Sequence, residues 1–171
     1  GADHEWSDAD AWTQEQQDDF WARLKAEWVK DVAGIVSYVN NNYRDAYAFD
    51  YTGFTPEEVA ASEDLQIVLG MVLWGFGEVA DGQFIAGVSG TTYDLETSFP
   101  TVEDYYNETY LAYEGDPDAY ASVESASGAD VLGDANSAFI GYWGPQDETM
   151  GGEGVPNIAG IVKVDDYTVQ V

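Results

Sequence analysis

The feature that most constrains the fold of this chain is a long amphipathic helix predicted over residues 13–42. Thr13 and Gln16 form the T-x-x-Q pattern of a capping box, which marks a helix start. Apolar side chains then recur at spacings of three and four, as on the buried face of a helix. The stripe consists of Trp21, Leu24, Trp28, Val32, Ile35 and Val39, widened by Phe20, Val29 and Val36. Asn40, Asn41 and Asn42 favour a left-handed exit.

A second segment, residues 65–79, is apolar on every side and predicts a helix at the centre of a bundle. It is shorter than the roughly 20 residues that cross a bilayer, and Gly70, Gly75 and Gly77 interrupt it. These glycines would let neighbouring helices approach closely. Thr55 and Pro56, just upstream, have the order of an N-cap and a first helical residue.

Local signals predict further elements. Thr101 with Asp104 and Asp116 with Pro117 each open a helix, and residues 130–142 have helical spacing. Residues 83–95 predict a short hairpin turning at Ser89–Gly90, and residues 144–156 form a glycine- and acid-rich linker. The predicted fold class is therefore mainly α, a compact helical bundle with a small β-hairpin at the C-terminus.

The charge balance excludes several function classes. The chain has 33 acidic residues against 5 basic ones, a formal net charge of -28, which disfavours nucleic acids and anionic membrane surfaces as partners. It has no cysteine, so disulfides and thiolate metal sites are excluded. The only histidine, His4, lies among scattered aspartates without the spacing of a metal site.

The sequence contains no pattern that indicates catalysis. A Ser-His-Asp triad would need His4, and no cofactor motif is present. Glu78, at the end of the apolar segment, comes closest to a carboxylate in an apolar context, but a charge at a helix end is the simpler interpretation. We therefore expect no enzyme activity, no catalytic, cofactor-binding or metal-binding residues, and no bound cofactor; the ligand-binding residues stay undefined.

The C-terminal residues 158–171 read I-x-G-I-x-x-V-D-D-Y-T-V-x-V, two β-branched runs around Asp165–Asp166. This stretch resembles a segment of the family 5 solute-binding proteins, the extracellular peptide receptors of ABC importers. T-Q-E-Q-Q-x-x-F-W, from Thr13 to Trp21, is similar to the opening of a long helical insertion in some of those receptors. The resemblance implies a helical insertion domain over residues 1–156 and a strand or hairpin over residues 157–171 that rejoins the parent sheet. Both ends of the chain are then expected to lie inside a longer protein.

The resemblance implies a non-catalytic accessory domain of an extracellular, cell-surface receptor whose parent protein is lipid-anchored. The implied partners are the parent receptor domains, the ABC permease reached through the parent, and a peptide ligand; nucleic acid and direct membrane insertion are not expected. The alternative is an aromatic-rich module that binds carbohydrate or cell-wall polymer. Its platform would stand on a predicted loop over residues 43–54, at Tyr43, Tyr47, Phe49 and Tyr51, with Trp6 and Trp143 as the indoles that helix faces do not use.

Overall fold

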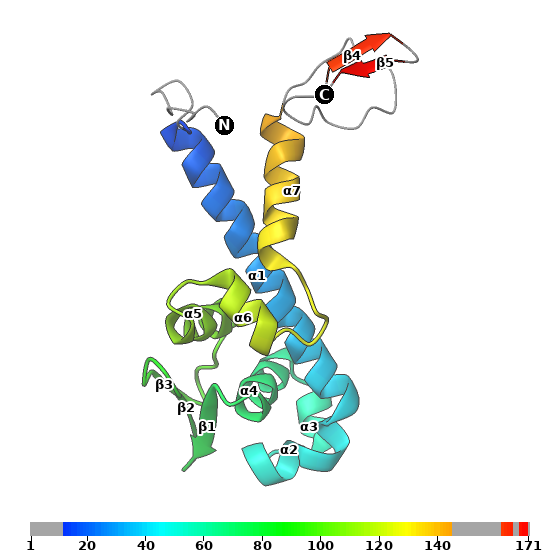
Figure 1. Ribbon diagram of the computed structural model, residues 1–171. Coiled ribbons are helices and arrows are strands. Elements are labelled where there is room, and N and C mark those ends of the chain that lie inside the picture. The colour runs from blue at the N-terminus through cyan, green and yellow to red at the C-terminus, as the bar shows by residue number, and fades with distance from the viewer. Residues whose placement is uncertain (1–11, 145–161, 166–167, 171) are drawn as a thin grey trace.

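The computed structural model describes residues 12–144, 162–165 and 168–170, and within them the chain is mainly α, as the sequence predicts (Figure 1). Residues 145–156 of the predicted linker and the positions of His4 and Trp6 lie outside the described residues. One long helix, α1, forms the axis, and α4, α5 and α7 pack against it.

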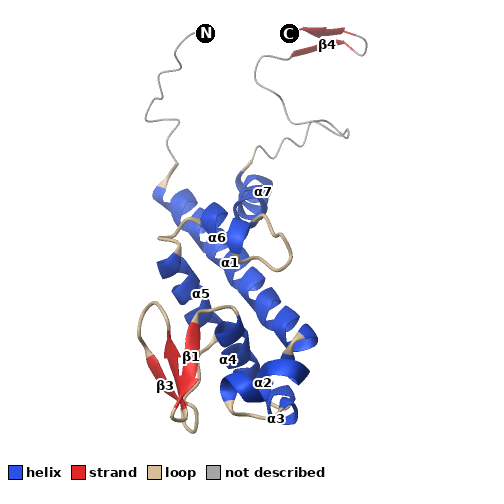
Figure 2. Ribbon diagram, turned by 60° about the horizontal axis from the view of Figure 1, so that its bottom comes forward, coloured by secondary structure: helices blue, strands red, loops and turns tan. Residues whose placement is uncertain are grey.

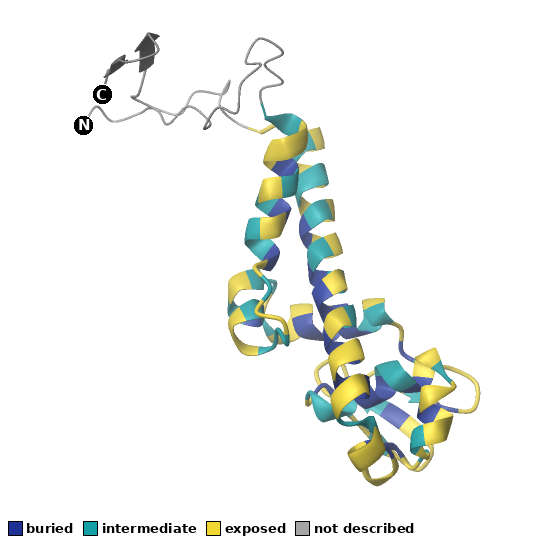
Figure 3. Cartoon of the chain, turned by 90° about the vertical axis from the view of Figure 1, so that its right-hand side faces the viewer, coloured by how far each residue is buried: buried dark blue, intermediate teal, exposed yellow. Residues whose placement is uncertain are grey.

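Helix α1 spans Gln14–Asn42 and begins with the predicted capping box. The backbone N–H of Gln16 donates to Thr13 Oγ1 at 3.2 Å, and that of Thr13 donates to Gln16 Oε1 at 2.9 Å. The predicted stripe is buried from Leu24 to Val39, but Trp21 is 60% exposed. Trp21 lies in the first half of α1, which among the described residues pairs with α7 away from the rest of the bundle, so the buried face is narrower there (Figure 3). The predicted left-handed exit is also wrong, because the residue that caps the C-terminal end, Tyr43, has φ −126°.

The aromatic run that we expected to be a loop is a helix, α2, spanning Arg44–Thr52. Its side chains have helical period: Ala48 and Thr52 are buried against the rest of the bundle, while the tyrosines follow another face. Gly53 ends the helix in a left-handed conformation, φ +78°, which glycine adopts without a steric cost. Helix α3, Pro56–Ala60, then starts from the predicted cap at Thr55.

Helix α4 spans Glu63–Leu73 and occupies the centre of the bundle, as predicted. Its buried residues include Leu65, Val68, Leu69 and Met71. Gly70 allows the close approach of α1, since a Cβ there would lie 3.1 Å from Val36 Cγ2. The apolar segment does not stay helical to residue 79, however. Gly75 turns the chain with φ +84°, and the remainder becomes strand β1, Gly77–Ala80.

Strands β1, β2 (Gln83–Ala86) and β3 (Thr92–Asp94) form an antiparallel sheet beside α4 and α5 (Figure 2). The predicted hairpin of β2 and β3 is confirmed, with Gly90 at φ +73°. Strand β1 was not predicted as such. It pairs with β2 through Asp81 and Gly82, both with positive φ, the two-residue turn that suits the twist of a hairpin.

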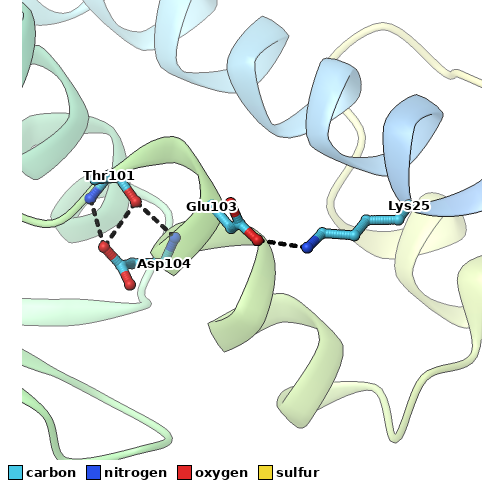
Figure 4. Close-up of polar contacts among 4 residues, drawn as sticks. All are labelled: Lys25, Thr101, Glu103 and Asp104. Carbon is cyan, nitrogen blue, oxygen red and sulfur yellow. Dashed lines mark hydrogen bonds and ion pairs between the residues drawn. The ribbon is translucent and has the colours of Figure 1, made fainter. Parts of the chain in front are cut away.

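The remaining helices begin where the sequence predicts. They are α5 (Val102–Ala112), α6 (Pro117–Val123) and α7 (Val131–Trp143), capped by Thr101, Asp116 and Asp130. Figure 4 shows the capping box of α5: Thr101 N donates to Asp104 Oδ2 at 2.8 Å, and Asp104 N donates to Thr101 Oγ1 at 3.1 Å. In the same view Lys25 of α1 forms an ion pair with Glu103 and so joins α1 to α5.

Helices α1 and α7 run antiparallel and side by side (Figure 1). Trp12 stacks on Phe139 with ring centroids 4.4 Å apart, and Trp143 Nε1 donates to Asp19 Oδ2 at 2.7 Å. The first described residue, Trp12, and the last residue of the helical body, Gly144, therefore lie at the same end of this helix pair. We call the half of α1 before Leu24 together with the end of α7 the stalk.

Two further strands confirm the predicted C-terminal hairpin. Strand β4, Val162–Asp165, pairs antiparallel with β5, Thr168–Gln170. The predicted domain boundary at residues 156 and 157 lies outside the described residues, as does residue 166 of the predicted Asp165–Asp166 turn.

Candidate functional site

The most buried carboxylate of α1 is Asp31, which is not one of the residues of the predicted apolar stripe. Its Oδ2 accepts a hydrogen bond from Tyr120 Oη at 2.7 Å. Its Oδ1 accepts from Ser125 Oγ at 3.0 Å and from Ser127 Oγ at 3.1 Å. Three hydroxyls thus replace the water that a buried carboxylate loses. The result is a polar anchor that fixes the segment between α6 and α7 to α1.

A cavity of about 320 Å³ lies beside this anchor. Its lining includes Glu27, Lys30, Asp31 and Asp134, and Lys30 pairs with Glu27 at 2.8 Å. Burial and the hydrogen bond to Asp31 raise the pKa of Tyr120, so its phenol stays protonated and donates. Among the described residues no group of three or more acidic or histidine side chains is placed to hold a metal ion. The contacts of Asp31 therefore account for its burial without a ligand.

A second cavity, of about 340 Å³, lies between α2 and the end of α4. We call it the aromatic groove. It is lined by Tyr43, Tyr47, Tyr51, Leu73 and Trp74. The three tyrosines are spaced by four residues, which places them on one face of a helix. Tyr47 and Tyr51 are 43% and 48% exposed, so the groove is open to solvent.

The rings of the aromatic groove are inclined to one another. Tyr43 and Tyr47 have centroids 6.2 Å apart at an interplanar angle of 51°, and Tyr47 and Tyr51 are 6.0 Å apart at 75°. Tyr38 extends the cluster, 5.8 Å from both Tyr43 and Trp74 and close to perpendicular to Trp74, at 82°. The tyrosine hydroxyls of 38 and 43 lie 3.5 Å apart, and this contact raises the pKa of Tyr43.

Trp74 is held in place by its indole, whose Nε1 donates to the carbonyl oxygen of Glu124 at 2.9 Å. The carboxylate of Glu124 in turn accepts a hydrogen bond from Tyr113. Burial, followed by this hydrogen bond, raises the pKa of Tyr113 to about 12. The position of the Trp74 side chain in the groove is therefore fixed by Glu124 at the end of α6, which is itself bonded to Tyr113 at the end of α5.

The structure brings together three of the four residues of the predicted aromatic platform. Tyr43, Tyr47 and Tyr51 line the groove, whereas Phe49 is 62% exposed and is not part of its lining. Trp143, expected to be free, donates to Asp19. That carboxylate also accepts from Arg23, whose hydrogen bond is the main cause that lowers the pKa of Asp19.

Sequence reasoning missed Trp74 and Asp31. Trp74 lies within residues 65–79, the segment predicted as a central helix, and only the tertiary fold brings it to α2. Asp31 had a local signal, since it lies three residues after Trp28 and four before Ile35, on the buried side of α1. Glu78 is exposed on β1 rather than at a helix end, so no apolar environment surrounds it.

No protein family matches the chain, and no curated protein or solved structure matches it either. Within the described residues no helix is both long and apolar enough to span a bilayer. The described residues form a mainly α domain with a small antiparallel sheet, a two-helix stalk, a buried polar anchor and an aromatic groove.

Proposed function

We propose that the chain is a non-catalytic accessory domain inserted into the extracellular peptide-binding receptor of an ABC importer. The observation that carries the proposal is the stalk. Residues 12 and 144 lie at one end of the antiparallel pair α1 and α7, so the helical body can leave and rejoin a host chain at neighbouring points. Domains with adjacent ends are the ones that proteins tolerate as insertions.

The stalk is stabilised by side-chain contacts between its two helices, α1 and α7. Trp12 and Phe20 both pack against Phe139, with centroids 4.4 and 5.7 Å away. Arg23 lies over the ring of Tyr142 at 5.1 Å, a cation–π contact. A pair of helices held in this way would transmit a defined orientation from the host to the rest of the domain.

The sequence likeness of residues 158–171 to the family 5 receptors gives the host its proposed identity. By that likeness the partners are the other domains of the receptor and, through them, the permease, at the outer face of the cell. A non-catalytic role is supported by the buried carboxylates. Asp31 accepts from hydroxyls, and Glu108 accepts from the backbone N–H groups of Val88 and Ser89, so both are used in structural contacts.

The encoding reading frame provides the first test. We expect a lipoprotein leader with its cysteine upstream of Gly1 and several hundred further receptor residues downstream of Val171. A stop codon directly after Val171 would contradict the proposal.

The accessory role has its own test in the full-length receptor. Replacing residues 12–144 by a short glycine-serine linker should leave peptide binding, measured by calorimetry, within about threefold of that of the intact protein, since flexible linkers can join neighbouring points. The matched control is the intact receptor carrying Phe49→Leu. Loss of peptide binding with a folded receptor would show that this domain is part of the peptide site and not an accessory to it.

One observation, the aromatic groove, supports the alternative that the chain binds carbohydrate. Tyrosines that line an open cavity are a common means of binding small ligands. However, a sugar ring stacks on a flat aromatic surface, and the neighbouring rings here are inclined by 51° and 75°. The groove therefore supports a ligand site more than it supports a glycan platform.

A further inference from the structure

We propose that the aromatic groove binds a small quaternary ammonium cation. The groove is the cavity between α2 and α4 lined by Tyr43, Tyr47, Tyr51, Leu73 and Trp74. The inference goes beyond the accessory role and does not depend on it, because it concerns contacts within the helical body alone.

The first argument is the arrangement of the rings. Four aromatic side chains, Tyr43, Tyr47, Tyr51 and Trp74, line the groove, and the neighbouring tyrosine rings are inclined to each other by 51° and 75°, so their faces are turned in different directions. A cation is attracted to the negative face of each aromatic ring that surrounds it, and several rings around one cation form an aromatic cage. Sites of about 300–1,000 Å³ hold small molecules, and this groove has about 340 Å³.

The second argument is charge. The chain carries a net charge of -28, which raises the local concentration of cations and repels anions. Every lysine and arginine among residues 12–144 is paired with a carboxylate, and Arg44, the one on α2, pairs with Asp45 at 3.2 Å. Within that part of the chain no basic side chain is left unpaired to repel a cation at the groove.

The third argument distinguishes among cations. A metal ion requires oxygen ligands, and a primary ammonium requires acceptors for three N–H groups. The lining holds no carboxylate, and its side-chain oxygens are tyrosine hydroxyls. The indole N–H of Trp74 already donates to Glu124, so it cannot donate to a sugar or a carboxylate ligand. A quaternary ammonium has no N–H and needs only aromatic faces and apolar contact, which the lining supplies.

The test is a calorimetric titration of the chain with choline and with its neutral isostere, in which carbon replaces the nitrogen. The two molecules have the same shape and differ in charge. We expect saturable binding of choline with one site per chain, and a dissociation constant at least about tenfold higher for the isostere. A neutral oligosaccharide forms the third arm and is expected to give no saturable heat.

Variants locate the site. Tyr47→Leu and Tyr51→Leu keep an apolar side chain at two partly exposed positions and remove the aromatic face, and each should weaken choline binding at least about fivefold. Phe49→Leu is the matched control, because Phe49 is on the same helix but outside the lining, and it should bind choline as the unchanged chain does.

Several results would overturn the proposal. Absence of saturable choline binding would do so, and so would equal binding of choline and its isostere, which would indicate an apolar site without a preference for charge. Choline binding that survives both tyrosine variants would place the cation on the acidic surface. Saturable binding of the oligosaccharide in preference to choline would indicate that the groove is a carbohydrate-binding site. The comparison of choline with the isostere needs no variant, so a folding defect in a variant leaves it decisive.

Discussion

At the scale of single residues, Asp31 joins distant parts of the helical body. It receives hydrogen bonds from Tyr120, Ser125 and Ser127, all more than 85 residues further along the chain. Asp31→Ala would leave three hydroxyl donors without their acceptor. We expect a loss of about 3 kcal/mol in the free energy of unfolding, measured by urea denaturation. Asp50→Ala, at an exposed position, is the control and should change stability by less than about 0.5 kcal/mol. Equal effects of the two substitutions would contradict the role of Asp31.

Two phenols give the stability of the fold a dependence on alkaline pH. The pKa of Tyr113 is raised to about 12, mainly by burial, and that of Tyr120 is raised by burial and by Asp31. Because an unfolded tyrosine titrates near pH 10, the folded state resists deprotonation. The stability that this difference contributes is complete below about pH 10 and is lost as the pH rises through the folded-state values.

We therefore expect the urea midpoint to fall as the pH is raised from about 9 to about 12. Tyr113→Phe and Tyr120→Phe should each be less stable than the unchanged chain at neutral pH, because each loses a hydrogen bond to a carboxylate. Each should also lose less stability over the same alkaline step. A pH dependence that is identical in all three proteins would show that these phenols are not its source.

At the scale of the elements, two helical glycines have opposite roles. A Cβ on Gly70 of α4 would lie 3.1 Å from Val36 Cγ2 and 3.3 Å from Val36 Cα, so α1 would have to move. A Cβ on Gly34 of α1 would meet no atom within 4 Å. Alanine is favoured over glycine inside a helix by about 0.5–1 kcal/mol, and that gain applies at both positions.

The two alanine substitutions should therefore change the free energy of unfolding in opposite directions. Gly34→Ala is expected to raise the free energy of unfolding by about 0.5–1 kcal/mol. Gly70→Ala is expected to lower it by about 1 kcal/mol, since the strain of overpacking, about 1–3 kcal/mol, exceeds the gain in helix propensity. Thermal denaturation of both variants measures the difference. Equal stabilisation would mean that α1 and α4 can separate without cost.

The elements that could be predicted are those whose signals are local. Thr13, Thr55 and Thr101 each exchange two hydrogen bonds with the residue three positions further on, so a short window of sequence is enough to predict these helix starts. Strand β1 also had a local signal in Asp81–Gly82, a typical hairpin turn, but the apolar run before it has the composition of a helix. Its strand conformation depends on β2: a Cβ on Gly77 would lie 2.4 Å from the ring of Phe84, so the pairing requires glycine there.

The candidate site divides in the same way. The spacing of Tyr43, Tyr47 and Tyr51 is in the sequence, and these residues were predicted as an aromatic set, although on a loop and not on a helix. Trp74 joins them only because α2 folds back on α4, a contact between segments that no local pattern specifies. Trp21 shows the converse: its helical spacing predicted burial, but within the described residues this half of α1 is paired with α7 away from the rest of the bundle, and Trp21 is exposed.

At the scale of the whole molecule, 33 acidic residues against 5 basic ones must share one surface. The ion pairs among residues 12–144 neutralise four carboxylates, those of Asp19, Glu27, Asp45 and Glu103. The remaining carboxylates repel one another, and this repulsion is stronger in the folded chain because folding brings the charges closer together. Exposed ion pairs contribute little to stability on their own, so they do not offset the repulsion.

Added salt should therefore stabilise this protein. Salt also weakens surface ion pairs, but here the screening of repulsion between carboxylates is the larger effect. The screening length falls from about 10 Å at 0.1 M to about 3 Å at 1 M ionic strength, which suppresses repulsion between carboxylates on different elements. We expect the thermal midpoint, followed by circular dichroism, to rise by roughly 5–10 °C between low salt and about 1 M sodium chloride. The rise should level off as screening saturates, whereas stabilisation by solute exclusion, measured in parallel with sucrose, should continue to grow with concentration. A midpoint that stays constant or falls with sodium chloride would mean that the four ion pairs, and not the unpaired carboxylates, dominate the electrostatics of the fold.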